Sequence, residues 1–332
     1  MQSNLAYNFR PENIPAAVSA FRPDNEVPVL NERHFDGGQR RVYKVDFLNG
    51  ESWAICLPIH VRSDSQDTII SLLRSERNIF QELGEKGFPW APKPRGSILT
   101  FENLVGFPFL ALVWIEGSPL SWSTTYPPRP VRDKVLRQVA EIQLSLIECT
   151  GENGGTATPF FLKLIDSKVH RIRNGKLPEL TEQDCFDQRK LLPQVLLPEL
   201  ENAPFAIDHG DLSPLNILVD SEHNVTGIID WGFAGKAPVQ LAGRLPRFLQ
   251  LPDLALTPSQ ILQEDRTVYV ASLRSHSSQV ASWMSLIQST EDVDFRDCFL
   301  ESLISKGMHR SLAGLGWELP NREPRGGSKF DA

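Results

Sequence analysis

The sequence has few of the features that would place a chain outside a cell or in a membrane. Its four cysteines, Cys56, Cys149, Cys185 and Cys298, lie far apart, whereas a zinc site needs close pairs and a small secreted scaffold needs a denser set. No apolar run approaches the about 20 residues that cross a bilayer. The first residues lack the basic start and apolar stretch of a signal peptide. These absences predict a cytoplasmic protein with reduced thiols.

An excess of positive charge is also missing. The chain has 34 lysine and arginine residues against 41 aspartate and glutamate residues, and its formal net charge is −7. Nucleic-acid surfaces usually carry a basic face, so we expect no nucleic-acid partner. We also expect no membrane partner and no obligate protein partner. A cationic small substrate would suit the acidic balance, but solubility is its commoner explanation.

The length predicts two lobes, because 332 residues exceed what one small core organises. Residues 1–33 are punctuated by proline and predict an N-terminal arm with one short helix. Residues 34–116 alternate short strands with one helix, whereas residues 117–332 are mainly helical. The sequence therefore predicts an α+β fold, with a small β-rich lobe followed by a larger helical lobe.

Individual elements follow from apolar spacing and turn residues. In the first lobe we predict strands over 42–47 and 53–57 with a turn at Asn49-Gly50, a helix capped by Asp67 and running to Leu83, and a buried strand over 109–115. In the second lobe we predict helices over 131–147, near 160–173 and 187–200, and across 258–315. A hairpin is expected from strands over 216–220 and 227–230.

Three polar residues around this hairpin carry the strongest functional signal. Asp211 lies in a loop, Asn216 begins the first strand, and Asp230 ends the second. Phosphoryl transfer needs a carboxylate that receives or orients a hydroxyl proton, and hard oxygen ligands that hold Mg²⁺ against phosphates. Asp211 fits the first need, and Asn216 and Asp230 fit the second. Each residue alone would more often be a turn former, a cap or a loop acid, but together they indicate a catalytic site.

The segments His209-Gly210-Asp211-Leu212-Ser213-Pro214-Leu215-Asn216 and Ile228-Ile229-Asp230-Trp231 closely resemble the motifs of the aminoglycoside phosphotransferase family, which includes choline kinases. Residues 232–235 and 238–242 resemble its fungal members. The resemblance implies a two-lobed protein-kinase-like fold that binds ATP, or GTP, and a small-molecule hydroxyl acceptor. It implies that Asp211 orients or deprotonates that hydroxyl and that Asn216 and Asp230 hold Mg²⁺.

In the first lobe the same resemblance implies nucleotide-binding residues. Gly37 and Gly38 stand where a phosphate-covering turn is expected, although an ordinary turn explains two glycines equally well. Glu76 occupies the helix position whose carboxylate pairs with a strand lysine or arginine in kinases. Backbone groups near Val113 and Ile115 are expected to meet adenine, while a plain core strand also explains these residues.

One position departs from the family pattern. The strand that should supply the cation carries Cys56 where we align the lysine or arginine. A thiol cannot replace a positive charge against nucleotide phosphates, and a buried structural cysteine is the simplest account of this residue. Arg41, Lys44 or Arg62 is a candidate substitute from nearby, or the chain binds nucleotide poorly or not at all.

The sequence therefore leaves several functions open. The leading hypothesis is an ATP-dependent small-molecule O-phosphotransferase. A pseudokinase or other binding protein is the alternative that Cys56 suggests, and a kinase fold repurposed for a different reaction in a biosynthetic pathway is a third. Protein kinase activity is disfavoured, because His209-Gly210-Asp211 replaces the usual His-Arg-Asp and no Ala-Pro-Glu pattern follows Asp230.

Overall fold

The computed structural model describes residues 8–61, 65–251, 254, 257–290 and 292–318. Its contacts divide the chain into two compact units, Met1–Leu120 with Leu215–Ala234, and Ser121–Pro214 with Gly235–Ala332. The hairpin that carries Asn216 and Asp230 thus groups with the N-terminal unit, whereas the sequence division at residue 116 places it in the second lobe. Asp211 belongs to the C-terminal unit.

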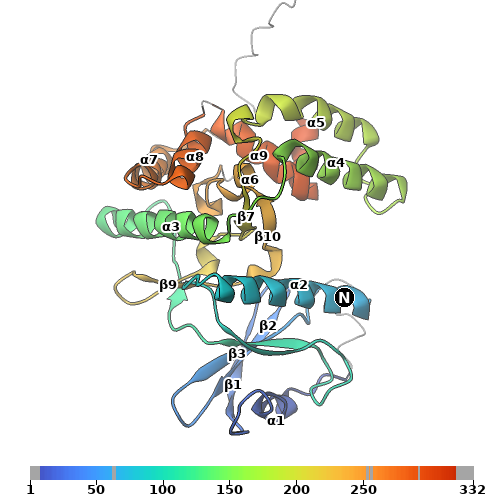
Figure 1. Cartoon of the computed structure of the whole chain (residues 1–332), viewed down its shortest axis with the longest axis vertical. Coiled ribbons are helices and arrows are strands. Elements are labelled where there is room, and N and C mark those ends of the chain that lie inside the picture. Colours follow the sequence, from blue (N-terminus) through green and yellow to red (C-terminus); the bar gives the residue numbers. More distant parts are fainter. Residues whose placement is uncertain (1–7, 62–64, 252–253, 255–256, 291, 319–332) are drawn as a thin grey trace, which may run out of the picture. The chain divides into compact units, whose positions relative to one another are not determined.

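An antiparallel five-stranded sheet in the order β1-β2-β3-β5-β4 organises the N-terminal unit (Figure 1). The elements of this unit are α1 (Ile14–Ser19), β1 (Val29–Asp36), β2 (Arg41–Asp46), β3 (Ser52–Leu57), α2 (Gln66–Glu85), β4 (Pro94–Ile98), β5 (Phe109–Val113), β6 (Ser118–Pro119), β8 (Ile217–Val219) and β9 (Val225–Ile228). The predicted β2–β3 hairpin is confirmed, and Gly50 in its turn has a φ of 83°, a value that glycine adopts without steric penalty.

One face of the five-stranded sheet carries the core of this unit. The core residues on β2 and β3 alternate along each strand and pack with three residues of α1; they are Tyr43, Val45, Trp53, Ile55, Leu57, Ile14, Ala17 and Val18. Successive side chains of a strand point to opposite faces, so Val42 on β2 and Cys56 on β3 point away from this core. The short helix predicted in the N-terminal arm is α1, and it supplies core residues.

Helix α2 begins slightly earlier than predicted. Its N-cap is Ser65, whose hydroxyl accepts a hydrogen bond from the Thr68 amide, so the prediction that Asp67 caps the helix is wrong. Asp67 instead lies in the first turn, where a carboxylate favours the helix dipole. The buried stripe along α2 consists of Ile69, Leu73, Glu76, Phe80 and Leu83. Glu76 is thus a carboxylate in the middle of an apolar stripe, a position that requires a partner.

The C-terminal unit is mainly helical, as predicted. Its elements are α3 (Arg129–Thr150), α4 (Ala157–Arg173), α5 (Glu182–Val195), β7 (Phe205–Asp208), β10 (Gly235–Pro238), α6 (Val239–Ala242), α7 (Gln260–Arg274), α8 (Gln279–Gln288), α9 (Val293–Ile304) and α10 (Lys306–Gly314). Helices α4, α5, α9 and α10 share one apolar cluster that ends at Trp317. Among the described residues, none of the helices has the length and apolarity that crossing a membrane would need.

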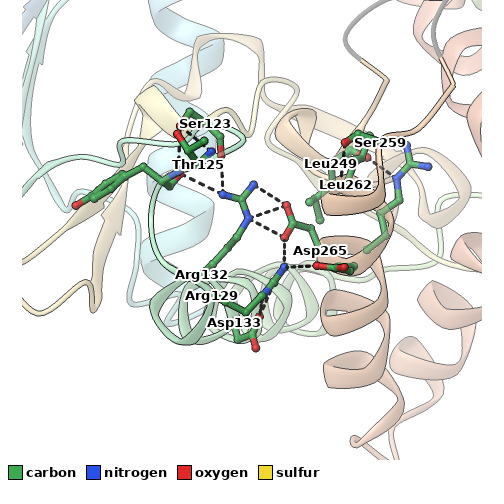
Figure 2. Close-up of polar contacts among 12 residues, drawn as sticks. Ser123, Thr125, Arg129, Arg132, Asp133, Leu249, Ser259, Leu262 and Asp265 are labelled. Atoms are coloured by element: carbon green, nitrogen blue, oxygen red, sulfur yellow. Dashed lines mark hydrogen bonds and ion pairs between the residues drawn. The ribbon is translucent and has the colours of Figure 1, made fainter.

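A buried ion pair joins α3 to α7 in this unit (Figure 2). Arg132 donates from Nε and Nη2 to both carboxylate oxygens of Asp265 at 2.7–2.9 Å, and from Nη1 to the Ser123 carbonyl at 2.7 Å. Its guanidinium carbon lies 3.9 Å from the ring centre of Trp122. The segment before α3 is therefore fixed to α3 and α7 by one arginine, whose three side-chain nitrogen atoms all donate hydrogen bonds.

Candidate functional site

A partly buried arginine pairs with Glu76, the helix carboxylate for which we predicted a strand cation. The Arg40 side chain, from the turn between β1 and β2, donates from Nη1 to Oε1 of Glu76 on α2. Its Nε lies 3.7 Å from Oδ1 of Asp230, which follows β9. The exposed fractions are 17% for the Arg40 side chain, 2% for Glu76 and 43% for Asp230. One guanidinium therefore links the predicted helix carboxylate to a predicted metal ligand.

Burial and charge act on the pair in opposite directions. Burial raises the pKa of Glu76, although Arg40 opposes this effect. For Arg40 burial favours the neutral form, but the carboxylates of Glu76 and Asp230 outweigh it and leave its pKa raised. Within the described residues, Oε2 of Glu76 is buried and has no hydrogen-bond partner. Arg40 thus favours the ionised form of Glu76 against the effect of burial on its pKa.

Cys56 lies close to this group and carries no charge of its own. Burial raises the pKa of its thiol to about 12, and the charges of Arg40, Glu76 and Asp230 all act on it. The thiol is therefore protonated at neutral pH. Cys56 therefore adds no charge to this cluster, and the arginine of the cluster comes from the turn between β1 and β2.

The candidate substitutes named from the sequence have other partners. Arg41 pairs with Asp36 on β1, from Nε at 2.7 Å and Nη2 at 3.0 Å. Lys44 pairs with Glu116 at 3.2 Å and with Asp46 at 3.5 Å. Arg62 lies outside the described residues. Arg40 was not among the substitutes predicted from the sequence, although strand periodicity, counted back by two from Val42, points to the face of Cys56.

Gly232 leaves room for the guanidinium. A Cβ at this position would overlap Nη2 of Arg40 and would lie 3.5 Å from Oδ1 of Asp230. Trp231 next to it is buried, donates from its indole nitrogen to the Ile228 carbonyl at 2.9 Å, and packs edge-on against Phe88. The loop after β9 is therefore anchored by Trp231 and kept open to Arg40 by Gly232.

The two predicted metal ligands lie at one end of the β8–β9 hairpin. Ile217 pairs with Ile228, and the Ile229 amide donates to the Asn216 carbonyl at 2.9 Å. Asp230 has a φ of 60° and a ψ of 65°, a left-handed conformation that is uncommon outside glycine and often marks functional residues. Asn216 is buried, whereas Asp230 is exposed, so one of the two predicted metal ligands is open to solvent.

The two-glycine turn has no structural need for glycine. The Gly37 amide donates to the Arg40 carbonyl at 2.8 Å and closes the turn. Neither Gly37 nor Gly38 has a positive φ, and a Cβ on Gly38 would meet no atom within 4 Å. Glycine with no steric reason in the folded chain suits a segment that a ligand approaches closely.

The predicted adenine contacts lie at the end of β5. The Val113 amide donates to the Lys93 carbonyl at 2.8 Å, and the Trp114 amide donates to the Ser52 carbonyl at 2.9 Å. Ile115 is half-buried, and a Cβ on Gly227 would overlap its side chain. The amide of Val113 is therefore engaged within the unit, and Ile115 is the better candidate for a ligand contact.

Asp211 lies in a tightly bonded loop of the C-terminal unit. The Asp211 amide donates to Nδ1 of His209 at 3.3 Å, and the Gly210 amide donates to the Asp208 carboxylate at 3.1 Å. An accepting Nδ1 leaves the neutral His209 ring protonated at Nε2. His209 is buried, so its structural role, rather than proton transfer, agrees with the geometry.

Charged side chains of both signs surround the Asp211 carboxylate in this unit. Nε of Arg247 lies 3.7 Å from Oδ1 of Asp211, with exposed fractions of 59% and 29%. A cavity of about 30 Å³ is lined by Asp208, Asp211, Arg244, Arg247 and Glu301, among others. Burial raises the pKa of Asp208, and Arg244 opposes the shift. Asp211 is therefore reachable from solvent beside a polar cavity.

The structure thus groups the predicted residues by unit. Glu76, Asp230 and Cys56 meet around Arg40 in the N-terminal unit, and Asn216 lies across the hairpin from Ile229. Gly37 and Gly38 belong to the turn that carries Arg40. Asp211 belongs to the other unit.

One known protein family and several solved structures match this chain. The sequence profile described as "Phosphotransferase enzyme family" matches residues 64–240, more than half of the chain. No curated protein matches the chain.

Several solved structures resemble the fold. A proposed aminoglycoside phosphotransferase from Ralstonia eutropha JMP134 has a TM-score of 0.58 and 14% identity, with 92% of this chain and 90% of that chain covered. An ethanolamine kinase from Plasmodium vivax has a TM-score of 0.54 and 14% identity, covering 86% and 82%. The APH(2″)-IIa complex with streptomycin and ATP has a TM-score of 0.52 and 12% identity, covering 86% and 90%. The predicted protein-kinase-like fold is confirmed, whereas the resemblance to fungal members stays a prediction.

Proposed function

Because the chain belongs to the phosphotransferase enzyme family, and is thus a small-molecule phosphotransferase by class, we propose that it transfers the γ-phosphoryl group of ATP to a hydroxyl group. The acceptor oxygen gains the phosphoryl group, the bond to the departing ADP breaks, and the hydroxyl proton passes to the Asp211 carboxylate. GTP is the second nucleotide to test. The acceptor is a small molecule whose identity the fold does not select.

The observation that carries this proposal is the hairpin end with Asn216 and Asp230, backed by Arg40 and Glu76. An amide oxygen and an exposed carboxylate are ligands that suit Mg²⁺, which usually takes one or two protein ligands and completes its shell with phosphates and water. Within the described residues, no group of three or more His, Cys, Asp and Glu side chains could hold a metal by itself. The residues present therefore fit a metal that arrives with its nucleotide.

Each chain residue has a distinct task in this mechanism. Mg²⁺, when bound, would neutralise charge on the phosphates. Asn216 and Asp230 would hold that ion, and Gly37 and Gly38 would allow backbone amides to approach phosphate oxygens. Asp211 would orient the acceptor hydroxyl and accept its proton. Positioning and electrostatics supply most of the rate in such transfers, since little covalent chemistry falls to the protein.

A direct test compares nucleotide binding with turnover. Calorimetry of the purified chain with ATP and with GTP, each with and without Mg²⁺, measures binding, and ADP or GDP release with water or pooled hydroxyl compounds measures turnover. We expect Asp211→Asn to keep the nucleotide affinity and to lower turnover by about 100-fold or more. We expect Asp230→Ala to lose the metal-dependent part of binding.

Cys56 favours a second candidate, a pseudokinase that keeps the fold as a binding module. The two candidates separate on the same samples. Metal-dependent nucleotide binding together with turnover that requires Asp211 supports the phosphotransferase. Absence of binding by either nucleotide in the unaltered chain would reject it and favour the binding module.

A further inference from the structure

We propose that Arg40 is the phosphate-binding cation of this chain, relocated from the strand position that Cys56 occupies to the turn between β1 and β2. This inference rests on the proposed function, since it assigns a residue to the same nucleotide site. All of the residues involved belong to the N-terminal unit.

The first support is the partner that Arg40 has. Glu76 lies in an otherwise apolar stripe of α2 and is 2% exposed. A buried carboxylate is held in place by a cation, and in kinases the cation so held is the one that contacts the α- and β-phosphates. Among the described residues, the hydrogen bond that Glu76 makes through its side chain is with Arg40.

The second support is the hydrogen-bonding capacity that Arg40 retains. A guanidinium offers five N–H donors, and within the described residues its side chain makes a hydrogen bond only through Nη1 to Glu76. Its Nε is 3.7 Å from Asp230, beyond hydrogen-bond length, and Nη2 lies beside Gly232. These remaining donors lie next to the proposed metal ligand, where phosphate oxygens are expected. Arginine binds phosphate through two donors at once.

The third support is the relation between Arg40 and Cys56. Cys56 points away from the core of the sheet, and the charge of Arg40 acts on its thiol. Val42, two residues after Arg40, pairs directly with Cys56 across β2 and β3. Arg40 thus reaches the same charge cluster from the turn that precedes β2. Oε2 of Glu76 is buried and has no hydrogen-bond partner among the described residues, so a lysine introduced at position 56 has an unused acceptor in this charge cluster.

The relocation has a structural consequence. The cation follows directly on Gly37 and Gly38, so the phosphate-covering turn and the phosphate-binding charge belong to one short segment. A ligand that orders this turn would at the same time place Arg40.

Calorimetry with Mg²⁺-ATP on single and double variants tests the proposal. We expect Arg40→Met to weaken Mg²⁺-ATP binding by about 10- to 100-fold. The matched control is Arg41→Met, which removes the adjacent arginine and its pair with Asp36, and which we expect to bind within about twofold of the unaltered chain. We expect the double variant Arg40→Met/Cys56→Lys to regain most of the lost affinity, because the lysine restores the charge from β3.

Circular dichroism melting checks that each variant folds. If Arg40→Met alone is unfolded, Arg40→Met/Glu76→Met removes both charges of the buried pair, a change that proteins often tolerate; it should fold and still bind Mg²⁺-ATP weakly. The proposal is overturned if folded Arg40→Met binds as tightly as the unaltered chain, if Arg41→Met loses as much, or if Cys56→Lys restores nothing. No binding by the unaltered chain would instead reject the proposed function itself.

Discussion

Each unit contains a buried carboxylate paired with an arginine, and the two pairs differ in how fully they are bonded. Arg132 uses Nε, Nη1 and Nη2, and both oxygens of Asp265 accept from it. Arg40 uses Nη1 towards Glu76, whose Oε2 has no hydrogen-bond partner among the described residues. Exposure differs in the same sense, at 6% for the Arg132 side chain and 17% for that of Arg40.

This difference separates a structural pair from a functional one. Buried charges are tolerated when their hydrogen bonds are complete, and the Arg132–Asp265 pair meets that condition while it ties α3 to α7. Among the described residues, the Arg40–Glu76 pair leaves donors and an acceptor unused beside the exposed carboxylate of Asp230. Unused donors that lie next to a solvent-exposed group suit a place where a ligand supplies the missing partners.

The largest effect should come from breaking the Arg132–Asp265 pair. Asp265→Ala leaves Arg132 buried without its carboxylate, so we expect a loss of about 3–5 kcal/mol in the free energy of unfolding. Chemical denaturation measures it. Because Asp265 belongs to the other unit, folded protein should bind Mg²⁺-ATP normally. A loss below about 1 kcal/mol would contradict the structural assignment of this pair.

A third buried carboxylate, that of Asp297, extends the comparison to the pH dependence of stability. Both oxygens of Asp297 are buried without a hydrogen-bond partner among the described residues, and burial raises its pKa from 3.8 to about 6, against the opposing charges of Arg244 and Arg296. Between pH 3.8 and about pH 6, the Asp297 carboxyl of the folded chain therefore holds a proton that the same group has lost in the unfolded chain. The associated stability is complete below pH 3.8 and is lost as the pH rises through about 6.

The variant Asp297→Asn removes this titration. We expect the free energy of unfolding of the variant, relative to that of the unaltered chain, to rise by about 2.4 kcal/mol between pH 4 and pH 7, since one pKa unit corresponds to about 1.4 kcal/mol. Urea denaturation at several pH values measures it. Parallel pH profiles for the two proteins would show that Asp297 does not titrate in this range.

The smallest expected effect comes from a variant that tests the Arg40–Glu76 pair and leaves both of its charges in place. Gly232→Ala places a Cβ that overlaps Nη2 of Arg40, so the guanidinium must leave its position in the folded chain. We expect Mg²⁺-ATP affinity to fall about tenfold, which is about 1.4 kcal/mol. Calorimetry measures the affinity, and Gly235→Ala, where a Cβ would meet nothing within 4 Å, is the control. Unchanged affinity would show that the place of Arg40 is not restricted by Gly232.

Much of this protein was determined by local sequence. The alternation over 42–47 and 53–57 with Asn49-Gly50 between them specifies the β2–β3 hairpin, because strand period and turn chemistry are local properties. The apolar spacing around Glu76 likewise specifies a helix with one carboxylate on its buried face. The family was evident in the segments around Asp211 and Asp230, whose residue types phosphoryl transfer demands.

Only the tertiary structure decided which basic side chain pairs with Glu76. The lysine and arginine residues nearest to Cys56 in the sequence are Arg40, Arg41, Lys44 and Arg62. Strand periodicity alone did not select among them, since Lys44 shares a face with Arg40. The choice depended on the path of the β1–β2 turn, on the pairing of Arg41 with Asp36 and of Lys44 with Glu116, and on the space left by Gly232. Contacts between segments far apart in the chain set these features, so local sequence determined the elements and tertiary packing determined the charge partner.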